Sequence, residues 1–276
     1  ESKVVCEIAH NLTRNRTPKD NTVLIMNPTS KNGRGKCNWD YFKDFEGIVT
    51  HSRENAIESV INSDKEIIVA VGGDGTINQC VNGIMNSGND KALGVLYSGT
   101  SPDFCKFHGI PYNPQEAVKT LKNGKPVDVD VCKITTKNEE EFYFSSSCNI
   151  GLGSKVAETS NKIRKYFGDF FGTLIALIYS LITAKAFDTK VKISNEVKEY
   201  KNLYHLFIVK NSYIASGLKF GIDCKVDDGK IYVIPIFKEN SFSVIKKIVG
   251  LYKGAFHGNM IVECEKVFIE TEPKQY

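Results

Sequence analysis

The fold is decided by the stretch Ile67-Ile-Val-Ala-Val-Gly-Gly-Asp-Gly-Thr76, which continues as Ile77-Asn-Gln-Cys-Val-Asn-Gly-Ile-Met85. Its continuous apolar run is typical of a strand that is buried on both faces. The residues after this run place apolar Ile77, Val81 and Ile84 at helical spacing. The sequence therefore predicts a strand, a glycine-rich turn and a helix in direct succession.

The chemistry of this turn points to phosphate. Gly72, Gly73 and Gly75 allow the backbone to approach an anion closely, and the start of the helix presents unpaired N–H groups. A carboxylate at Asp74 would repel phosphate, so the arrangement suits a turn in which Mg²⁺ lies between the two or Asp74 handles a proton. The alternative is a tight turn in which Asp74 only caps the helix. A cap alone would not require three flanking glycines, which favours the phosphate site.

The elements around the turn predict two domains of different class. Before residue 128, strands and helices alternate as in a mainly parallel sheet flanked by helices. The strands are expected at 22–27, 66–71 and 93–97, and the helices at 54–61, 77–85 and 115–122. Beyond it, runs rich in β-branched and aromatic residues predict antiparallel strands at 129–135, 141–147, 190–194, 203–210, 230–237 and 262–270. Helical patterns at 155–184 and 241–252 interrupt them. We expect an α/β domain at 22–130 and an antiparallel β-sandwich domain with inserted helices at 131–276.

Composition excludes several classes of protein. The 276 residues carry a net charge of +4, which is too mild for a dedicated nucleic-acid binder. Eight cysteines occur without a CxxC pair, so we expect reduced thiols in a cytosol and neither a zinc site nor a disulfide framework. The start, Glu1–His10, lacks the pattern of a secretory signal, and the apolar segment Phe170–Ala184 is shorter than the roughly 20 residues of a spanning helix. We expect a cytoplasmic chain without a transmembrane segment.

Further motifs narrow the phosphate chemistry. The sequence has neither GxxxxGK[ST] nor the His-Arg-Asp and Asp-Phe-Gly pair, which argues against P-loop enzymes and protein kinases. Gly72–Thr76 instead resembles the mark shared by diacylglycerol kinases, NAD kinases and phosphofructokinases. Three more stretches carry a closer resemblance: Asn27-Pro-Thr-Ser-Lys-Asn-Gly-Arg-Gly35, Gly99-Thr-Ser-Pro-Asp-Phe-Cys-Lys106 followed by His108-Gly-Ile-Pro111, and Phe220-Gly-Ile-Asp-Cys-Lys-Val-Asp-Asp-Gly229. By their order and spacing, the chain resembles the diacylglycerol kinase catalytic-domain family from Thr22 to about Thr271.

The resemblance implies a nucleotide cleft between the two domains and a role for each matching residue. The residues implied to bind the nucleotide are Asn27, Pro28, Thr29, Gly72, Gly73, Asp74, Gly75, Thr76, Gly99 and Thr100. The implied catalytic residues are Asp74, Asp103 and Asp130, and the implied metal site contains Asp223, Asp227 and Asp228. The alternatives are that Asp103 caps a helix, that Asp130 ends a strand, and that Asp227 and Asp228 form only a polar turn.

The sequence also departs from the family pattern. Lys31 stands where the family has Gly, and Pro102 stands where it has Asn, so both loops are expected to hold the nucleotide differently. The family's general base is a Glu in an Asp-Gly-Glu motif after a strand like Val267–Glu270, and no such motif precedes Tyr276. Either the sequence is trimmed or the protein lacks this base, and we expect trimming.

Together these observations predict an ATP- and Mg²⁺-dependent lipid kinase that phosphorylates diacylglycerol or a related lipid alcohol at the inner face of a membrane. The rivals are an NAD kinase-like enzyme and a non-catalytic nucleotide- or lipid-binding relative. Arg164–Phe167 and the apolar run behind it form a candidate membrane contact, with a core helix as the equal alternative. The sequence leaves open which lipid is the acceptor and whether the chain forms a homodimer.

Overall fold

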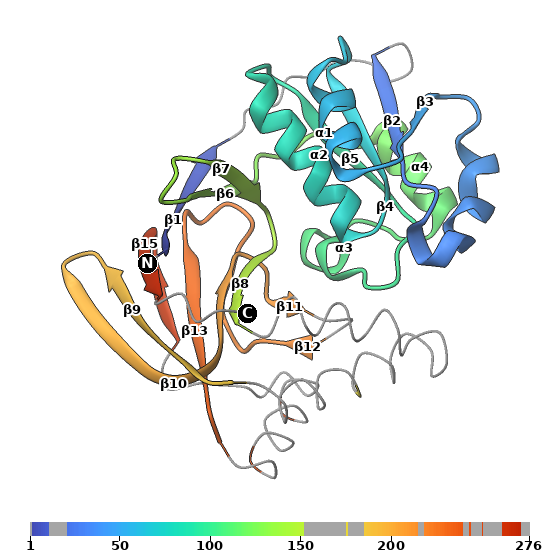
Figure 1. The fold of residues 1–276 in the computed structure, drawn as a ribbon. Coiled ribbons are helices and arrows are strands. Elements are labelled where there is room, and N and C mark those ends of the chain that lie inside the picture. The colour runs from blue at the N-terminus through green and yellow to red at the C-terminus, as the bar shows by residue number, and fades with distance from the viewer. Residues whose placement is uncertain are drawn as a thin grey trace. The chain divides into compact units, whose positions relative to one another are not determined.

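The structure is a computed structural model that describes residues 2–10, 21–151, 175, 185–214, 218–239, 243, 250 and 261–271. The chain divides into two compact units (Figure 1). The first contains residues 10–131 and 143–145, and the second contains residues 1–9, 132–142 and 146–276. The predicted bounds of two domains and the predicted cleft between them stay predictions.

The first unit is built on a four-stranded parallel sheet with the order β3-β2-β4-β5. The strands are β2 (Thr22–Met26), β3 (Glu46–Val49), β4 (Ile67–Gly72) and β5 (Ala92–Tyr97). The helices between and after them are the 3-10 helix η1 (Ser30–Phe42), α1 (Arg53–Ile61), α2 (Asp74–Ser87), α3 (Asp103–His108) and α4 (Pro114–Asn123). The prediction of a parallel α/β first part is therefore confirmed.

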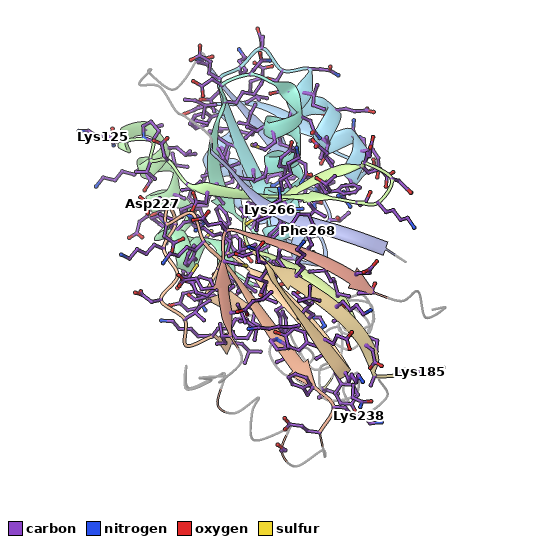
Figure 2. The ribbon with its side chains drawn as sticks, turned by 90° about the vertical axis from the view of Figure 1, so that its left-hand side faces the viewer. Lys125, Lys185, Asp227, Lys238, Lys266 and Phe268 are labelled. Carbon is purple, nitrogen blue, oxygen red and sulfur yellow. The ribbon has the colours of Figure 1, made fainter. Side chains whose placement is uncertain are left out.

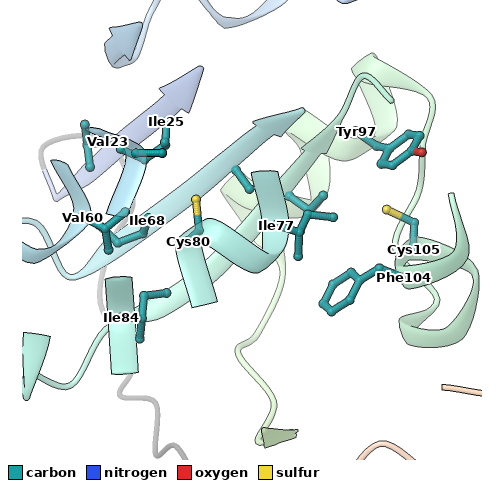
Figure 3. Packing of buried hydrophobic residues seen from close by; sticks show 13 residues of the cluster. Val23, Ile25, Val60, Ile68, Ile77, Cys80, Ile84, Tyr97, Phe104 and Cys105 are labelled. Carbon is teal, nitrogen blue, oxygen red and sulfur yellow. The ribbon is translucent and has the colours of Figure 1, made fainter. Parts of the chain in front are cut away.

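Alternate side chains of the central strands fill two cores, one on each face of the sheet. On one face, Val23 and Ile68 pack with residues of α1, α2 and α3, such as Val60 and Ile77 (Figure 3). On the other face, strand residues pack against η1 and α4. Because β4 is buried on both faces, its whole length reads as apolar, which explains why the sequence marks it so clearly.

The strand order brings the ends of β2 and β4 together. From β2 the chain moves outward to β3, and from β4 it moves outward in the opposite direction to β5. The carboxyl ends of β2 and β4 therefore flank the topological switch point, which is where open α/β sheets bind ligands. Asn27 follows β2 there and the glycine-rich turn follows β4.

The second unit contains an antiparallel sheet, as predicted. Nine strands form it: β1 (Ser2–His10), β6 (Asp130–Thr135), β7 (Glu141–Phe144), β8 (Ser147–Gly151), β9 (Phe187–Ile193), β10 (Glu196–Val209), β13 (Ile231–Phe237), β14 (Val262–Cys264) and β15 (Lys266–Thr271). The pairing order is β14-β13-β10-β9-β15-β1-β6-β7, and β8 pairs with β10. The first half of β10 pairs with β9 and its second half with β13 and β8, with register shifts between Tyr200 and His205. A separate pair joins β11 (Tyr213–Ile214) and β12 (Leu218–Lys219).

Strand β1 was not predicted, and it pairs antiparallel with β15, at the other end of the chain. In the first unit, β3, η1 and α3 were not predicted either. The two predicted helical patterns, 155–184 and 241–252, lie outside the described residues apart from isolated positions. Within the parts of the chain that are described, no helix has the length and apolar character needed to cross a membrane.

Candidate functional site

The candidate site of the first unit consists of three loops that follow β2, β4 and β5. Asn27 joins the first two, because its Nδ2 donates a hydrogen bond to Thr76 Oγ1 at 3.1 Å. Its Oδ1 accepts hydrogen bonds from the amide and the hydroxyl of Thr29, at 2.9 and 2.8 Å. The first and third loops are joined by the buried pair Ser30 Oγ and Ser98 Oγ, 3.0 Å apart. The predicted nucleotide-binding residue Asn27 is therefore also the residue that fixes two loops in place.

Gly99 and Gly72 are required because neighbouring atoms lie too close to leave room for a side chain. A Cβ at Gly99 would lie 2.5 Å from the Cα of Gly73 and 2.7 Å from the Tyr97 hydroxyl. A Cβ at Gly72 would lie 2.2 Å from Thr76 Oγ1. Contacts this short do not occur between real atoms, so these glycines are explained by packing alone.

Gly75 differs from the other glycines of the turn. It is the second residue of α2, it is exposed, and a Cβ added there would meet no atom within 4 Å. Its φ does not lie in the left-handed region. Neither crowding nor backbone conformation explains a glycine at this position, whereas close approach by a ligand to the amides of the helix start does. This open space beside unpaired N–H groups suits a phosphate.

Asp74 carries the electrostatics of the turn. Its Oδ1 is buried and has no hydrogen-bond partner. Burial, and then the negative charge of Asp103, raise the pKa of Asp74 from 3.8 to about 7, although hydrogen bonds from the amides of Phe104 and Asp103 act in the opposite direction. A buried carboxylate with an unsatisfied oxygen is costly unless a cation or a proton compensates it. The side chain is thus arranged to take up a positive charge.

Asp103 lies at the start of α3, where it is buried and where Ser101 Oγ donates a hydrogen bond to its Oδ2 at 2.9 Å. Pro102 occupies the N-cap position of α3 and offers no side-chain cap. Asp103 lies close enough to Asp74 for its negative charge to raise the pKa of Asp74. Two of the three predicted catalytic carboxylates therefore lie near each other. Asp130, the third, is buried at the first position of β6.

The other predicted nucleotide-binding residues lie in the same loops. Pro28 and Thr29 follow Asn27, and Thr100 follows Gly99. Lys31 has a φ of +51°, a left-handed conformation that favours glycine. Lys31 therefore stands in place of the Gly of the family pattern and still has a backbone conformation that favours glycine.

The three predicted metal ligands lie in the second unit, in the turn after β12. Asp223 and Asp227 are exposed (Asp227 is labelled in Figure 2). Asp228 instead accepts hydrogen bonds from a lysine and from two backbone amides. In the described portion of the chain, no group of three or more His, Cys, Asp or Glu side chains is placed to hold a metal ion. Sequence reasoning missed the lysine, Lys210, and no local pattern marks it.

Comparison with known proteins decides the relationship that these loops suggest. Residues 21–134, which contain all three loops, match the profile described as Diacylglycerol kinase catalytic domain. Residues 21–134 of the chain belong to the diacylglycerol kinase catalytic domain family. The resemblance expected from the motifs is confirmed.

Bacterial relatives of this family extend the match. The chain is 30% identical to a diacylglycerol kinase of Staphylococcus epidermidis over 198 residues, which are 70% of this chain and 58% of that protein. It is 31% identical to a diacylglycerol kinase of Staphylococcus haemolyticus over 201 residues, or 72% of this chain and 58% of that protein. The matched region thus spans less than two thirds of these curated relatives. A crystal structure of a diacylglycerol kinase from Bacillus anthracis str. Sterne shares the fold, with a TM-score of 0.68, 23% identity and coverage of 95% of this chain and 89% of that one.

We expect the hydrogen bond between Asn27 and Thr76 to contribute to the stability of the protein. Thr76 is buried, so Thr76→Val keeps its shape and leaves the Asn27 amide without its acceptor. We expect the free energy of unfolding, measured by urea denaturation, to fall by about 1–2 kcal/mol. Thr29→Val is the matched control, because its hydroxyl bond to Asn27 is exposed and its loss is expected to cost less than about 0.5 kcal/mol. Equal effects of the two variants would contradict the proposed link between the loops.

Proposed function

We propose that the chain is an ATP-dependent lipid kinase that transfers the γ-phosphate to a lipid hydroxyl, with diacylglycerol as the first acceptor to test. The observation that carries the proposal is the pairing of open space at Gly75 with the unsatisfied buried oxygen of Asp74 in one turn. A triphosphate would fill the open space at Gly75, and its divalent cation would compensate the buried oxygen of Asp74. The relatives named diacylglycerol kinase support the choice of acceptor.

The residues of the three loops would bind the phosphates, hold the loops in position and attract the cation. The amides at the start of α2 bind phosphate oxygens, and Asn27 and Thr76 keep the loops at their separation. Asp74, with Asp103 beside it, attracts the cation to one side of the phosphates. Mg²⁺, when bound, would neutralise charge on the phosphoryl group. Phosphoryl transfer depends mainly on positioning and charge stabilisation, which these residues offer without a covalent step.

The roles of Thr100, Pro28 and Thr29 at the nucleotide and of Asp130 as a catalytic carboxylate are part of the same proposal. So is action at the cytoplasmic face of a membrane, where the lipid acceptor lies. The candidate membrane contact at 164–182 falls outside the described residues, apart from position 175.

The proposal is tested by incubating the protein with γ-labelled ATP and Mg²⁺ in three parallel reactions, which contain diacylglycerol vesicles, a total membrane lipid extract, or NAD. We expect label in an organic-extractable phospholipid in the first two reactions and none on NAD. Asp74→Asn should remove the signal while the variant keeps a cooperative melting transition. Label on NAD alone would favour an NAD kinase, and tight ATP binding without product in any reaction would favour a non-catalytic relative.

A further inference from the structure

A buried lysine lies against the turn of the second unit that contains the predicted metal ligands. Lys210 directly follows β10, and its side chain is only 1% exposed. Its ammonium donates a hydrogen bond to Asp228 Oδ1 and forms an ion pair with that carboxylate, whose side chain is 13% exposed. The backbone holds this lysine in place, because its N–H donates to Ser146 O at 2.8 Å and its carbonyl accepts from Cys224 Sγ at 3.1 Å.

Asp228 also organises the turn around itself. Its Oδ2 accepts a hydrogen bond from the amide of Lys225 at 3.0 Å, and its Oδ1 accepts one from the amide of Lys230 at 3.0 Å. Burial acts to raise the pKa of Asp228, but the hydrogen bonds from Lys210 and the two amides outweigh it and hold the pKa below its ordinary value. The hydrogen bonds that Asp228 accepts from Lys210 and from two amides five residues apart therefore close the turn.

The residues present do not fit the metal ion that the family resemblance implies for this turn. A divalent cation needs oxygen ligands with free lone pairs that converge on one point. Both oxygens of Asp228 already accept N–H donors, and the ammonium of Lys210 beside them would repel a second cation. The other two carboxylates, Asp223 and Asp227, are exposed, and the described residues contain no group of three side chains suited to a metal.

We propose that the ammonium of Lys210 is the resident cation of the Asp223–Gly229 turn, in the place that the resemblance assigns to a divalent metal. A partly buried carboxylate requires a compensating charge, and here a covalently attached side chain supplies it. The turn then forms without any metal ion.

Thermal unfolding without nucleotide or lipid tests this, so the result does not depend on the proposed kinase activity. The wild-type protein and Asp228→Asn are melted in excess MgCl₂ and in excess EDTA. We expect the change in Tm between the two buffers to be the same for both proteins. A stabilisation by Mg²⁺ that Asp228→Asn removes would overturn the proposal, and this comparison holds even if variants of Lys210 fail to fold.

A second set of variants tests the lysine itself. Lys210→Met keeps the apolar stem and removes the charge, and we expect it to lower Tm by roughly 5–10 °C, because it leaves a partly buried carboxylate without its counter-ion. Lys225→Met removes an exposed charge from the same turn and should leave Tm within about 1 °C. Adding Asp228→Asn to Lys210→Met should recover part of the loss. A Lys210→Met protein with wild-type Tm would contradict the role of the lysine.

Discussion

Asp74→Asn is expected to abolish phosphoryl transfer and, in the nucleotide-free protein, to raise stability at neutral pH. The neutral amide keeps the shape of the carboxyl group but no longer attracts a cation to the phosphates. Because removal of one preorganised charge at a reacting centre typically costs about 10²–10⁴-fold in rate, the loss in kcat should fall in or above that range. The measurement is the rate of label transfer to lipid at saturating ATP. A variant with normal kcat would exclude Asp74 from the site.

The gain in stability follows from the raised pKa of Asp74. Between its ordinary value of 3.8 and about 7, the carboxyl group stays protonated in the folded protein and is ionised in the unfolded chain. The unfolded state then binds fewer protons, so this group lowers the free energy of unfolding as pH rises through that window. Above about pH 7 the penalty is constant, because both states are ionised.

Asp74→Asn removes this penalty. The difference in the free energy of unfolding between variant and wild type should grow from pH 4 to pH 7, reach roughly 2–4 kcal/mol and then level off. Urea unfolding at a series of pH values measures it. Glu58→Gln, on an exposed position of α1, is the control for the loss of one negative charge and should show no such trend. If the difference in the free energy of unfolding stayed constant from pH 4 to pH 7, it would contradict the raised pKa of the buried Asp74.

Gly75→Ala should reduce ATP affinity by at least about 10²-fold while the fold is retained or slightly stabilised. The added Cβ meets no protein atom within 4 Å, and alanine is more favourable than glycine inside a helix by up to about 1 kcal/mol. The same Cβ occupies the space through which phosphate reaches the amides of α2. Calorimetric titration with a non-hydrolysable ATP analogue measures the affinity, and the melting temperature reports on the fold.

Gly99→Ala is the matched comparison. Its Cβ would lie 2.5 Å from the Cα of Gly73, so we expect it to lower the free energy of unfolding by roughly 1–3 kcal/mol. Gly75→Ala therefore tests a glycine that leaves space for ligand, and Gly99→Ala tests a glycine that packing requires. Wild-type ATP affinity in Gly75→Ala would remove the main reason for placing phosphate at this turn.

Six elements of the first unit were predicted from sequence because their signals are local, whereas β3, η1 and α3 were not predicted. The apolar run of β4, the glycines after it and the periodicity of α2 are contiguous, and the structure places the helix at Asp74–Ser87 around the predicted 77–85. Helix α4 is marked in the same way by Asn113, whose side chain accepts hydrogen bonds from two amides, and by proline at its first position. Such signals fix an element without knowledge of its partners.

The remaining features depend on partners that are distant in sequence. Strand β1 has its partner in β15, with Ser2 opposite Thr271. Lys210, which directly follows β10, contacts Asp228 in the Asp223–Gly229 turn, 18 residues further along the chain. Gly99 approaches Gly73 because β4 and β5 are neighbours in the sheet. The family resemblance implied a metal site at Asp223, Asp227 and Asp228, and no local pattern in the sequence indicates that Lys210 donates a hydrogen bond to Asp228.

A crystal structure of the protein with a non-hydrolysable ATP analogue and Mg²⁺ would show directly whether the glycine-rich turn after β4 binds the triphosphate. We expect the triphosphate to lie on the amides of Gly73–Thr76, in the space beside Gly75, with the metal ion on the Asp74 side. A nucleotide bound elsewhere, with this turn left free of phosphate, would contradict the account.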